Sequence, residues 1–231
     1  MNNNSKTVPN VHISYNQKVR PYHLEIARLF EKYSSPSLDY DLLEIGCGFG
    51  YTLELIKNKR PDTRISAADI DPYLLTTTNK KVTLHRSIEI NPMGNFEDLF
   101  DLKLTFDCII LSHVLEHTRR PYDIVRGIMK MLTPNGLAIV AVPNPVRPTI
   151  FYGNILKRHY VNRGHVYSWD RSHWINFLER ICCVSVEEYS QDYVPLPWFD
   201  KFAIFKPLEI SLSSFFPWLC FSNIAVIKNK E

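Results

Sequence analysis

The stretch LLEIGCGFG places three glycines at every second position directly after an apolar run. Glycine has no Cβ, so it adopts positive φ angles without strain and lets a ligand approach the backbone closely. A loop of this kind between a strand and a helix is the usual ligand contact in an open α/β sheet. The predicted binding loop, with the carboxylate just before it, consists of Glu44, Gly46, Cys47, Gly48 and Gly50.

The spacing and the charge of this loop narrow the class of ligand. Dinucleotide-binding loops have the pattern GxGxxG and rest a pyrophosphate on a helix N-terminus. Here the pattern is GxGxG, with Tyr51 where that third glycine would stand, and Glu44 would repel a pyrophosphate but attract a cation. Asp69 ends the next apolar stretch, where a carboxylate can accept both hydroxyls of a ribose. A ribose joined to a cationic, phosphate-free remainder describes S-adenosylmethionine (SAM).

Four segments of the chain resemble, in the correct order, the motifs of class I SAM-dependent methyltransferases of the small-molecule type. They read EIGCGFG, AADID, FDCIILSHVLEH and LTPNGLAIVAVPN, and the resemblance spans roughly residues 38–145. It implies SAM as the cofactor, with Glu44 and the glycine loop at the methionine end and Asp69 at the ribose. It also implies adenine contacts from Ser87 and Ile88. Further cofactor contacts implied by the resemblance are Ile70, Ser112 and His113.

Three histidines fall where the strand ends would form a site. Histidine titrates near neutral pH, so it is suited to take the proton that an acceptor loses on methylation. His165, in RGHVYSW, matches a GHxxxW/F segment that the family has beside its acceptor pocket. We expect His165 to be the catalytic base or the residue that orients the acceptor. His113 and His117 are the other catalytic candidates.

His113, Glu116 and His117 can share one face of a helical turn, because residues three and four apart are neighbours there. In ubiquinone-pathway O-methyltransferases, which this stretch resembles, the Glu–His pair helps to hold a divalent metal together with a further acidic residue. That residue is missing here, since Val114 and Leu115 precede Glu116. We therefore predict no metal, and a packing or capping role for Glu116 and His117.

The elements that must position these residues alternate between strand and helix. Apolar runs of strand length are followed by stretches with helical spacing, which favours a parallel sheet covered by helices. We predict a doubly wound, Rossmann-like, mostly parallel seven-stranded α/β fold with helices on both faces. The predicted strands are 42–45, 64–69, 81–88, 106–112, 137–142, 182–190 and 223–228. The predicted helices are 24–30, 51–58, 72–78, 121–132 and 169–180.

The chain divides into a flexible tail and lead-in, residues 1–20, and a single SAM-binding methyltransferase domain, residues 21–231. The first ten residues are polar and lack the apolar core of a signal peptide. Cap insertions at about 145–168 and 192–221 are rich in aromatic residues, and we expect them to cover the carboxyl ends of the strands. Such a cap suits a small organic acceptor or the head of a lipid- or sugar-linked one.

The composition is that of a cytoplasmic globular protein. Of the 231 residues 45% are hydrophobic, and the net charge is only +3 with scattered lysines and arginines, which disfavours nucleic acid as a partner. The five cysteines show no CxxC spacing, so we interpret them as reduced core residues. The late apolar stretch 204–227 is interrupted by charged residues and prolines, which disfavours stable membrane insertion.

These observations predict a methyltransferase that moves a methyl group from SAM to a small organic acceptor. The favoured acceptor atom is an oxygen of a sugar, a quinol-like ring or a secondary metabolite, while nitrogen and carbon stay open. One alternative is a non-catalytic SAM-binding or protein-interaction module with the same fold. Others are a nicotinamide-dependent oxidoreductase and an RNA methyltransferase, the latter disfavoured because the sequence has no basic block and no NPPY-like signature.

Overall fold

The computed structural model of the chain describes most of the predicted domain. The described residues are 18–35, 39–91, 96–147, 150, 153, 155–157, 164–193, 204, 206–216 and 220–230. The predicted flexible tail lies almost entirely within residues 1–17, which are outside the described part. Large portions of both predicted cap insertions are also outside it.

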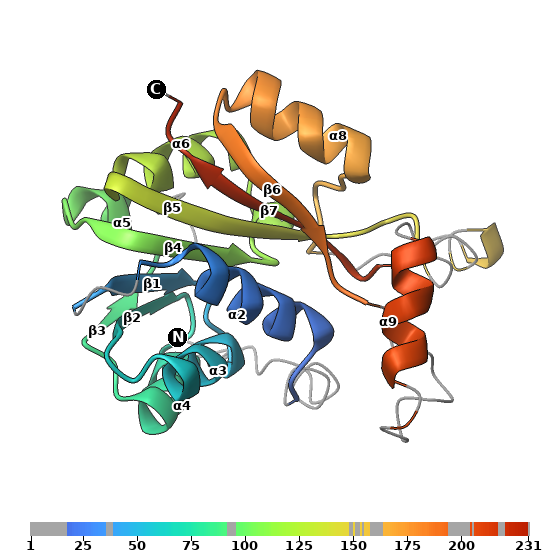
Figure 1. The fold of residues 1–231 in the computed structure, drawn as a ribbon. Coiled ribbons are helices and arrows are strands. Elements are labelled where there is room, and N and C mark those ends of the chain that lie inside the picture. Colours follow the sequence, from blue (N-terminus) through green and yellow to red (C-terminus); the bar gives the residue numbers. More distant parts are fainter. Residues whose placement is uncertain are drawn as a thin grey trace, which may run out of the picture.

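A seven-stranded sheet forms the centre of the molecule, in the order β3-β2-β1-β4-β5-β7-β6 (Figure 1). Strands β1 to β5 pair in parallel, whereas β7 pairs antiparallel with β5 and β6. The strands are β1 (Asp41–Ile45), β2 (Arg64–Asp69), β3 (Arg86–Glu89), β4 (Phe106–Ser112), β5 (Leu132–Pro143), β6 (Ser185–Gln191) and β7 (Ser222–Lys228). The strand order reverses between β1 and β4, and ligands bind at such a switch point in open α/β sheets. The predicted Rossmann-like fold is confirmed.

Helices pack on both faces of the sheet and divide the core in two. The helices are α2 (Pro21–Tyr33), α3 (Tyr51–Lys59), α4 (Pro72–Val82), α5 (Glu97–Asp101), α6 (Pro121–Lys130), α8 (Arg171–Asn176) and α9 (Lys206–Phe215), with the short turns η1 (Leu115–His117) and η2 (Phe177–Ile181). Successive strand side chains point to opposite faces, so Ile109 and Leu111 join the core under α5, α6 and α8. Cys108 and Ile110 join the core under α2, α3 and α4. None of the described helices is both long and apolar enough to span a bilayer.

Several predicted elements begin at other residues than predicted: α2 begins at Pro21, β5 at Leu132 and β6 at Ser185, in place of residues 24, 137 and 182. Two further differences have a local cause. The predicted strand 81–88 is shorter, because Lys81 and Val82 belong to the end of α4 and the strand starts at Arg86. The predicted helix 169–180 begins at Arg171 instead, because the Asp170 side chain caps it by accepting hydrogen bonds from Ser172 N and His173 N. It then continues as the π-helical turn η2.

The first helix is tied to the far edge of the sheet through Glu188 of β6. Its carboxylate accepts a hydrogen bond from Lys32 Nζ at 2.6 Å and from Tyr33 Oη at 2.7 Å. With the end of α2 fixed in this way, the first turn of the helix brings Tyr22 and His23 beside the carboxyl end of β4, where the Tyr22 ring lies 4.4 Å from that of His113.

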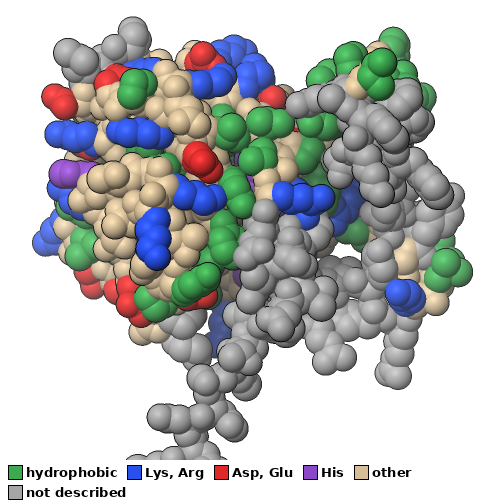
Figure 2. Space-filling view, turned by 90° about the horizontal axis from the view of Figure 1, so that it is seen from below, with side chains coloured by type: hydrophobic (Ala, Val, Ile, Leu, Met, Phe, Trp, Pro, Cys, Tyr) green, Lys and Arg blue, Asp and Glu red, His purple; other side chains and the backbone are tan. Residues whose placement is uncertain are grey.

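Charged side chains of both signs are spread over the described part of the face in Figure 2, among hydrophobic and other side chains. Lys and Arg do not gather there into one continuous block. This distribution agrees with the scattered basic residues of the sequence.

The start of α8 gives a test of how the fold is specified. Asp170 Oδ1 accepts hydrogen bonds from Ser172 N at 2.8 Å and His173 N at 3.0 Å, and loss of such a cap costs about 1 kcal/mol. Asp170→Ala should therefore lower the free energy of unfolding in urea by that amount. Asp170→Asn should retain most of the free energy of unfolding, because an amide oxygen also caps a helix and the exposed ion pair with His173 contributes little. An Asn variant as unstable as the Ala variant would show that charge, rather than capping, holds this helix start.

Candidate functional site

The glycine loop joins β1 to α3 with a backbone that other residues rarely adopt. Gly46, Gly48 and Gly50 have φ angles of 74°, 52° and 73°, all in the left-handed region that favours glycine. Gly46 N donates to Ala68 O at 2.7 Å, which fixes the loop to the end of β2. A Cβ atom at Gly46 would lie 2.4 Å from Cγ2 of Val114. The space that glycine leaves in this loop is therefore needed for the fold as well as for a ligand.

Asp69 connects the end of β2 to this loop. Its side chain is buried, with Oδ2 accepting from Gly48 N at 3.0 Å and Oδ1 accepting from Asp71 N at 3.0 Å. Burial raises the pKa of Asp69 while the bonds from these amides oppose the rise. Asp69 does not cap α4, because the Asp71 side chain performs that role by accepting from Tyr73 N.

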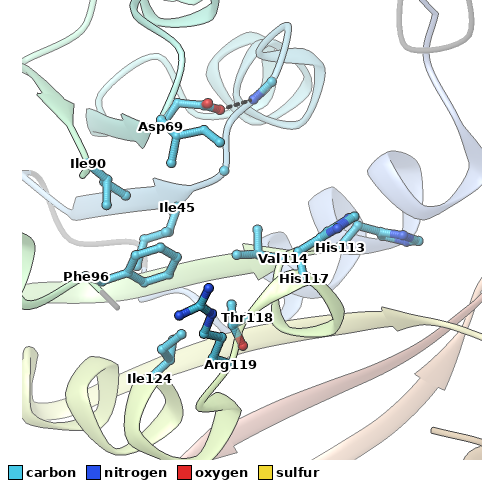
Figure 3. A pocket seen from close by; sticks show the side chains of 13 residues that line it. Ile45, Asp69, Ile90, Phe96, His113, Val114, His117, Thr118, Arg119 and Ile124 are labelled. Atoms are coloured by element: carbon cyan, nitrogen blue, oxygen red, sulfur yellow. Dashed lines mark hydrogen bonds between the residues drawn. The ribbon is translucent and has the colours of Figure 1, made fainter. Parts of the chain in front are cut away.

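A cavity of about 440 Å³ opens beside the loop at the switch point of the sheet. Figure 3 shows Asp69 at one end and Phe96, Ile45 and Arg119 further along it. The lining residues are Ile45, Gly46, Gly48, Asp69, Ile70, Ile90, Phe96, His113, Val114, His117, Thr118, Arg119 and Ile124. An apolar slot with a few polar groups at one end is typical of sites that bind small organic ligands.

The lining includes six of the residues predicted from the sequence. These are Gly46, Gly48, Asp69, Ile70, His113 and His117. The predicted residues outside the lining are Glu44, Cys47, Gly50, Ser87, Ile88, Ser112 and His165. Ser87 is exposed, and Ile88 packs against the hydrophobic core. The slot is instead lined by Ile90 and Phe96, the latter following four residues outside the described part.

Glu44 lies beneath the loop and is almost fully buried. Its pKa is raised to about 8, mainly by burial; the Thr52 side chain opposes the rise and the charge of Asp69 adds to it. The group is therefore largely protonated at pH 7 while no cation is near. A positive charge bound above the loop would lower the pKa of Glu44 and favour its ionised form.

Four hydrogen bonds tie residues 164–167 to η1 and the residues beside it. Val166 N and Tyr167 N donate to the Glu116 carbonyl at 2.8 and 3.2 Å. The others join His117 Nδ1 to the Gly164 carbonyl at 3.1 Å and Tyr167 Oη to the Arg119 carbonyl at 3.2 Å.

This attachment puts the His165 ring 4.7 Å from the His117 ring. The pKa of His165 is lowered to about 4, mainly by burial and also by the charges of His117 and Arg147. Burial lowers the pKa of His117 as well. Two of the three candidate catalytic histidines thus lie together, and both rings are neutral at pH 7.

The Glu116 carboxyl group lies among these imidazoles. Its Oε1 atom is 3.7 Å from His113 Nδ1 and 3.8 Å from His117 Nε2, and the side chain is 1% exposed. Burial raises the pKa of Glu116 to about 8. The ligand atoms of Glu116, His117 and His165 all lie within 4.8 Å of one another. One carboxylate and two imidazoles form a donor set that fits Zn²⁺, Fe²⁺ or Mn²⁺.

Several residues around His113 were not predicted from the sequence. The Phe221 ring lies 5.8 Å from the His113 ring and is tilted against it, and Ser222 Oγ lies 2.8 Å from His113 Nε2. Tyr22 contributes the other ring. These contacts come from α2 and from the start of β7, so no local spacing in the sequence could have indicated them.

The known proteins to which the chain is similar include several methyltransferases. The methyltransferase-domain family matches residues 43–138. The chain is similar to the malonyl-[acyl-carrier protein] O-methyltransferase of Priestia megaterium, with 32% identity over 41% of this chain and 34% of that protein. It is also similar to the ubiquinone biosynthesis O-methyltransferase of Rickettsia conorii, with 23% identity over 68% of this chain and 54% of that protein. The chain thus spans between a third and about half of the length of these curated relatives.

The fold is also that of a solved methyltransferase. The plantazolicin methyltransferase BpumL, solved with a pentazolic desmethylPZN analog and SAH, has a TM-score of 0.64. The two chains share 15% sequence identity, over 96% of this chain and 90% of that one. At this identity the likeness establishes the fold alone.

Two glycine variants test whether the loop forms the ligand site. Gly46→Ala introduces the close contact with Val114, whereas an added Cβ at Gly48 meets nothing within 4 Å. Both changes carry the left-handed backbone cost of about 1–2 kcal/mol. We expect Gly46→Ala to weaken binding of S-adenosylhomocysteine (SAH), measured by calorimetry, at least about tenfold more than Gly48→Ala. Adding Val114→Ala should recover part of that loss, and equal losses in both single variants would contradict the assignment.

Proposed function

We propose that the chain transfers the methyl group of SAM to an oxygen of a small organic acceptor, because its motifs resemble those of class I SAM-dependent methyltransferases and its fold is that of a solved methyltransferase. The observation that carries this proposal is the left-handed glycine loop bonded to Asp69 at the switch point of the sheet. An α/β fold of this kind serves many chemistries. The loop and its carboxylate are what favour a nucleoside donor without phosphate.

We propose a placement of SAM in this cavity on the basis of its lining. Asp69 would accept the ribose hydroxyls, and the apolar slot with Ile90 and Phe96 would hold the adenine. The methionine end would lie over Gly46, above Glu44. The positive charge of SAM there favours ionised Glu44, so cofactor and carboxylate would stabilise each other.

Methyl transfer from a sulfonium is an in-line displacement. The acceptor oxygen forms the new bond to the methyl carbon, the C–S bond breaks with its electrons going to sulfur, and SAH leaves. The acceptor hydroxyl loses its proton, which a neutral imidazole can take. His165 and His117 are neutral at pH 7, because burial lowers the pKa of both, and His165 is our preferred base.

Transfer to oxygen is supported by the names of the two curated relatives, both O-methyltransferases. It is also supported by the pair of neutral imidazoles, since removal of a proton is needed for a hydroxyl acceptor. A role as a non-catalytic module is the alternative. It is disfavoured because the glycine loop, Asp69 and the paired histidines are all present.

A divalent metal is a second candidate component, carried by Glu116, His117 and His165. The sequence lacks the further acidic ligand of the ubiquinone-pathway O-methyltransferases that it resembles. His165, which lies elsewhere in the chain, offers an imidazole nitrogen as the third ligand atom. A metal held there would polarise the acceptor oxygen and lower the pKa of its hydroxyl. No step proposed above depends on such an ion.

The ribose assignment predicts the behaviour of Asp69. Asp69→Ala removes charge-assisted hydrogen bonds to two hydroxyls, which should cost about 2–4 kcal/mol in the binding free energy of SAM or SAH by calorimetry. Asp69→Asn keeps an acceptor for Gly48 N, so its loop should stay in place and its loss should be smaller. Unchanged affinity in Asp69→Ala would refute the assignment.

Measurement of methyl transfer tests the proposed role of His165 as the base. Transfer of labelled methyl from SAM should be screened with catechols, malonyl thioesters and phenolic or sugar hydroxyl compounds. With the best acceptor, His165→Ala should lower kcat by about 100-fold or more, as loss of a general base does. The dissociation constant for SAH should stay within about twofold. His173→Ala, an exposed histidine of α8, is the matched control and should keep full activity. Equal turnover in His165→Ala would exclude His165 from the mechanism.

A further inference from the structure

We propose that Arg119 recognises the edge of the cofactor's purine base and lets the site bind a base with an oxygen at C6 at least as tightly as adenine. The expected second ligand is S-inosylhomocysteine (SIH), in which hypoxanthine replaces the adenine of SAH. This inference rests on the proposed function, because it places the ribose at Asp69 and the base in the apolar slot.

The slot beside Asp69 has apolar walls. Ile45, Ile90, Phe96 and Ile124 line it, and all four side chains are buried. Phe96 has a φ of 66°, which is an outlier for an aromatic residue, and such backbone strain clusters at ligand sites. Apolar walls pack against the faces of a base, but they offer no hydrogen bond to its polar edge.

Arg119 brings hydrogen-bond donors to the end of this slot. It lines the cavity, and Figure 3 shows its guanidinium group pointing toward Phe96, away from Asp69. Its carbonyl accepts a hydrogen bond from Tyr167 Oη at 3.2 Å, which holds the backbone in place. Among the described residues the guanidinium group has no hydrogen-bond or ion-pair partner. Its donors are therefore available to a ligand.

The attachment of the base to the ribose decides which edge reaches Arg119. A purine is joined to its ribose through N9, and C6 lies on the opposite side of the two rings. With the ribose hydroxyls on Asp69, a base that extends along the slot directs C6 away from that carboxylate. Arg119 lies in that direction (Figure 3). The C6 substituent and the ring nitrogen beside it are thus the groups that face the guanidinium group.

The chemistry of this edge sets the preference between bases. A guanidinium group has five N–H donors and no acceptor. Adenine carries an amino group at C6, which donates, whereas a 6-oxo purine carries an oxygen there, which accepts and is the usual partner of arginine in protein–DNA complexes. Adenine still offers its ring nitrogens as acceptors, so SAM is bound as well. A carboxylate would favour adenine by accepting from its amino group, but the one carboxylate in the described lining is Asp69, at the ribose.

Calorimetric titration of the full chain with SAH and with SIH tests this assignment. Wild type should bind SIH with a Kd no higher than that for SAH. Arg119→Met keeps an apolar stem but removes every donor, so the Kd for SIH should rise about tenfold more than the Kd for SAH. Arg119→Lys, which keeps the charge but loses the planar fork, should give a smaller change.

Arg120→Met is the matched control. Arg120 Nε lies 3.4 Å from Asp123 Oδ2, and Arg120 does not line the cavity, so both Kd values should stay at those of wild type. The Arg119 side chain is exposed and has no partner among the described residues. Its replacement should therefore leave the fold intact, which the midpoint of unfolding in urea checks.

Two results would overturn the proposal while SAH still binds. One is weaker binding of SIH than of SAH by wild type, and the other is an unchanged ratio of the two Kd values in Arg119→Met. Both results leave the proposed function standing. Absence of binding of both ligands to wild type would contradict the proposed function, and this inference with it.

Discussion

The hydrogen bond from Gly48 N to the Asp69 carboxylate is the interaction on which the site depends. It joins the end of β2 to the loop after β1, beside the point where the strand order reverses. Burying a carboxylate is costly unless it is hydrogen-bonded, and the amides of Gly48 and Asp71 supply those bonds. Gly48 N points at the Asp69 carboxylate because the three glycines of the loop have positive φ angles. Ligand binding and local folding therefore impose the same requirement on this loop.

The side of the cavity on which we propose that the acceptor binds has a different construction. Its residues come from α2, η1, residues 164–167 and the corner before β7, and they are joined by backbone hydrogen bonds to Glu116 and by the bonds to Asp192. Parallel strands form the donor side, whereas the antiparallel strands β6 and β7 support the acceptor side. A fold that keeps the first half and varies the second can retain one cofactor while changing its acceptor.

Much of the fold, and the cavity lining formed by the glycine loop and Asp69, could be predicted from the sequence, because both depend on local patterns. Apolar runs ended by Gly46 and Asp69 mark strands and a loop, and the bounds of β2 and β4 agree with those predicted. The acceptor half depends on contacts between distant residues. His165 is held near Glu116 because the next two amides, of Val166 and Tyr167, donate to the Glu116 carbonyl. Asp192 accepts hydrogen bonds from the distant amides of Phe221 and Ser222, and neither arrangement leaves a spacing in the sequence. Ser87 and Ile88 were placed at the adenine by resemblance, whereas Ile90 and Phe96 line the slot.

The central claim is that the loop after β1 takes a nucleoside without phosphate. Calorimetric titration of the wild-type chain with SAH, and separately with NADH, tests this claim most directly. We expect binding of one SAH per chain and no measurable heat of binding with NADH, because the Asp69 carboxylate accepts ribose hydroxyls but repels a pyrophosphate bound at the loop. Binding of NADH, or no binding of SAH, would contradict it.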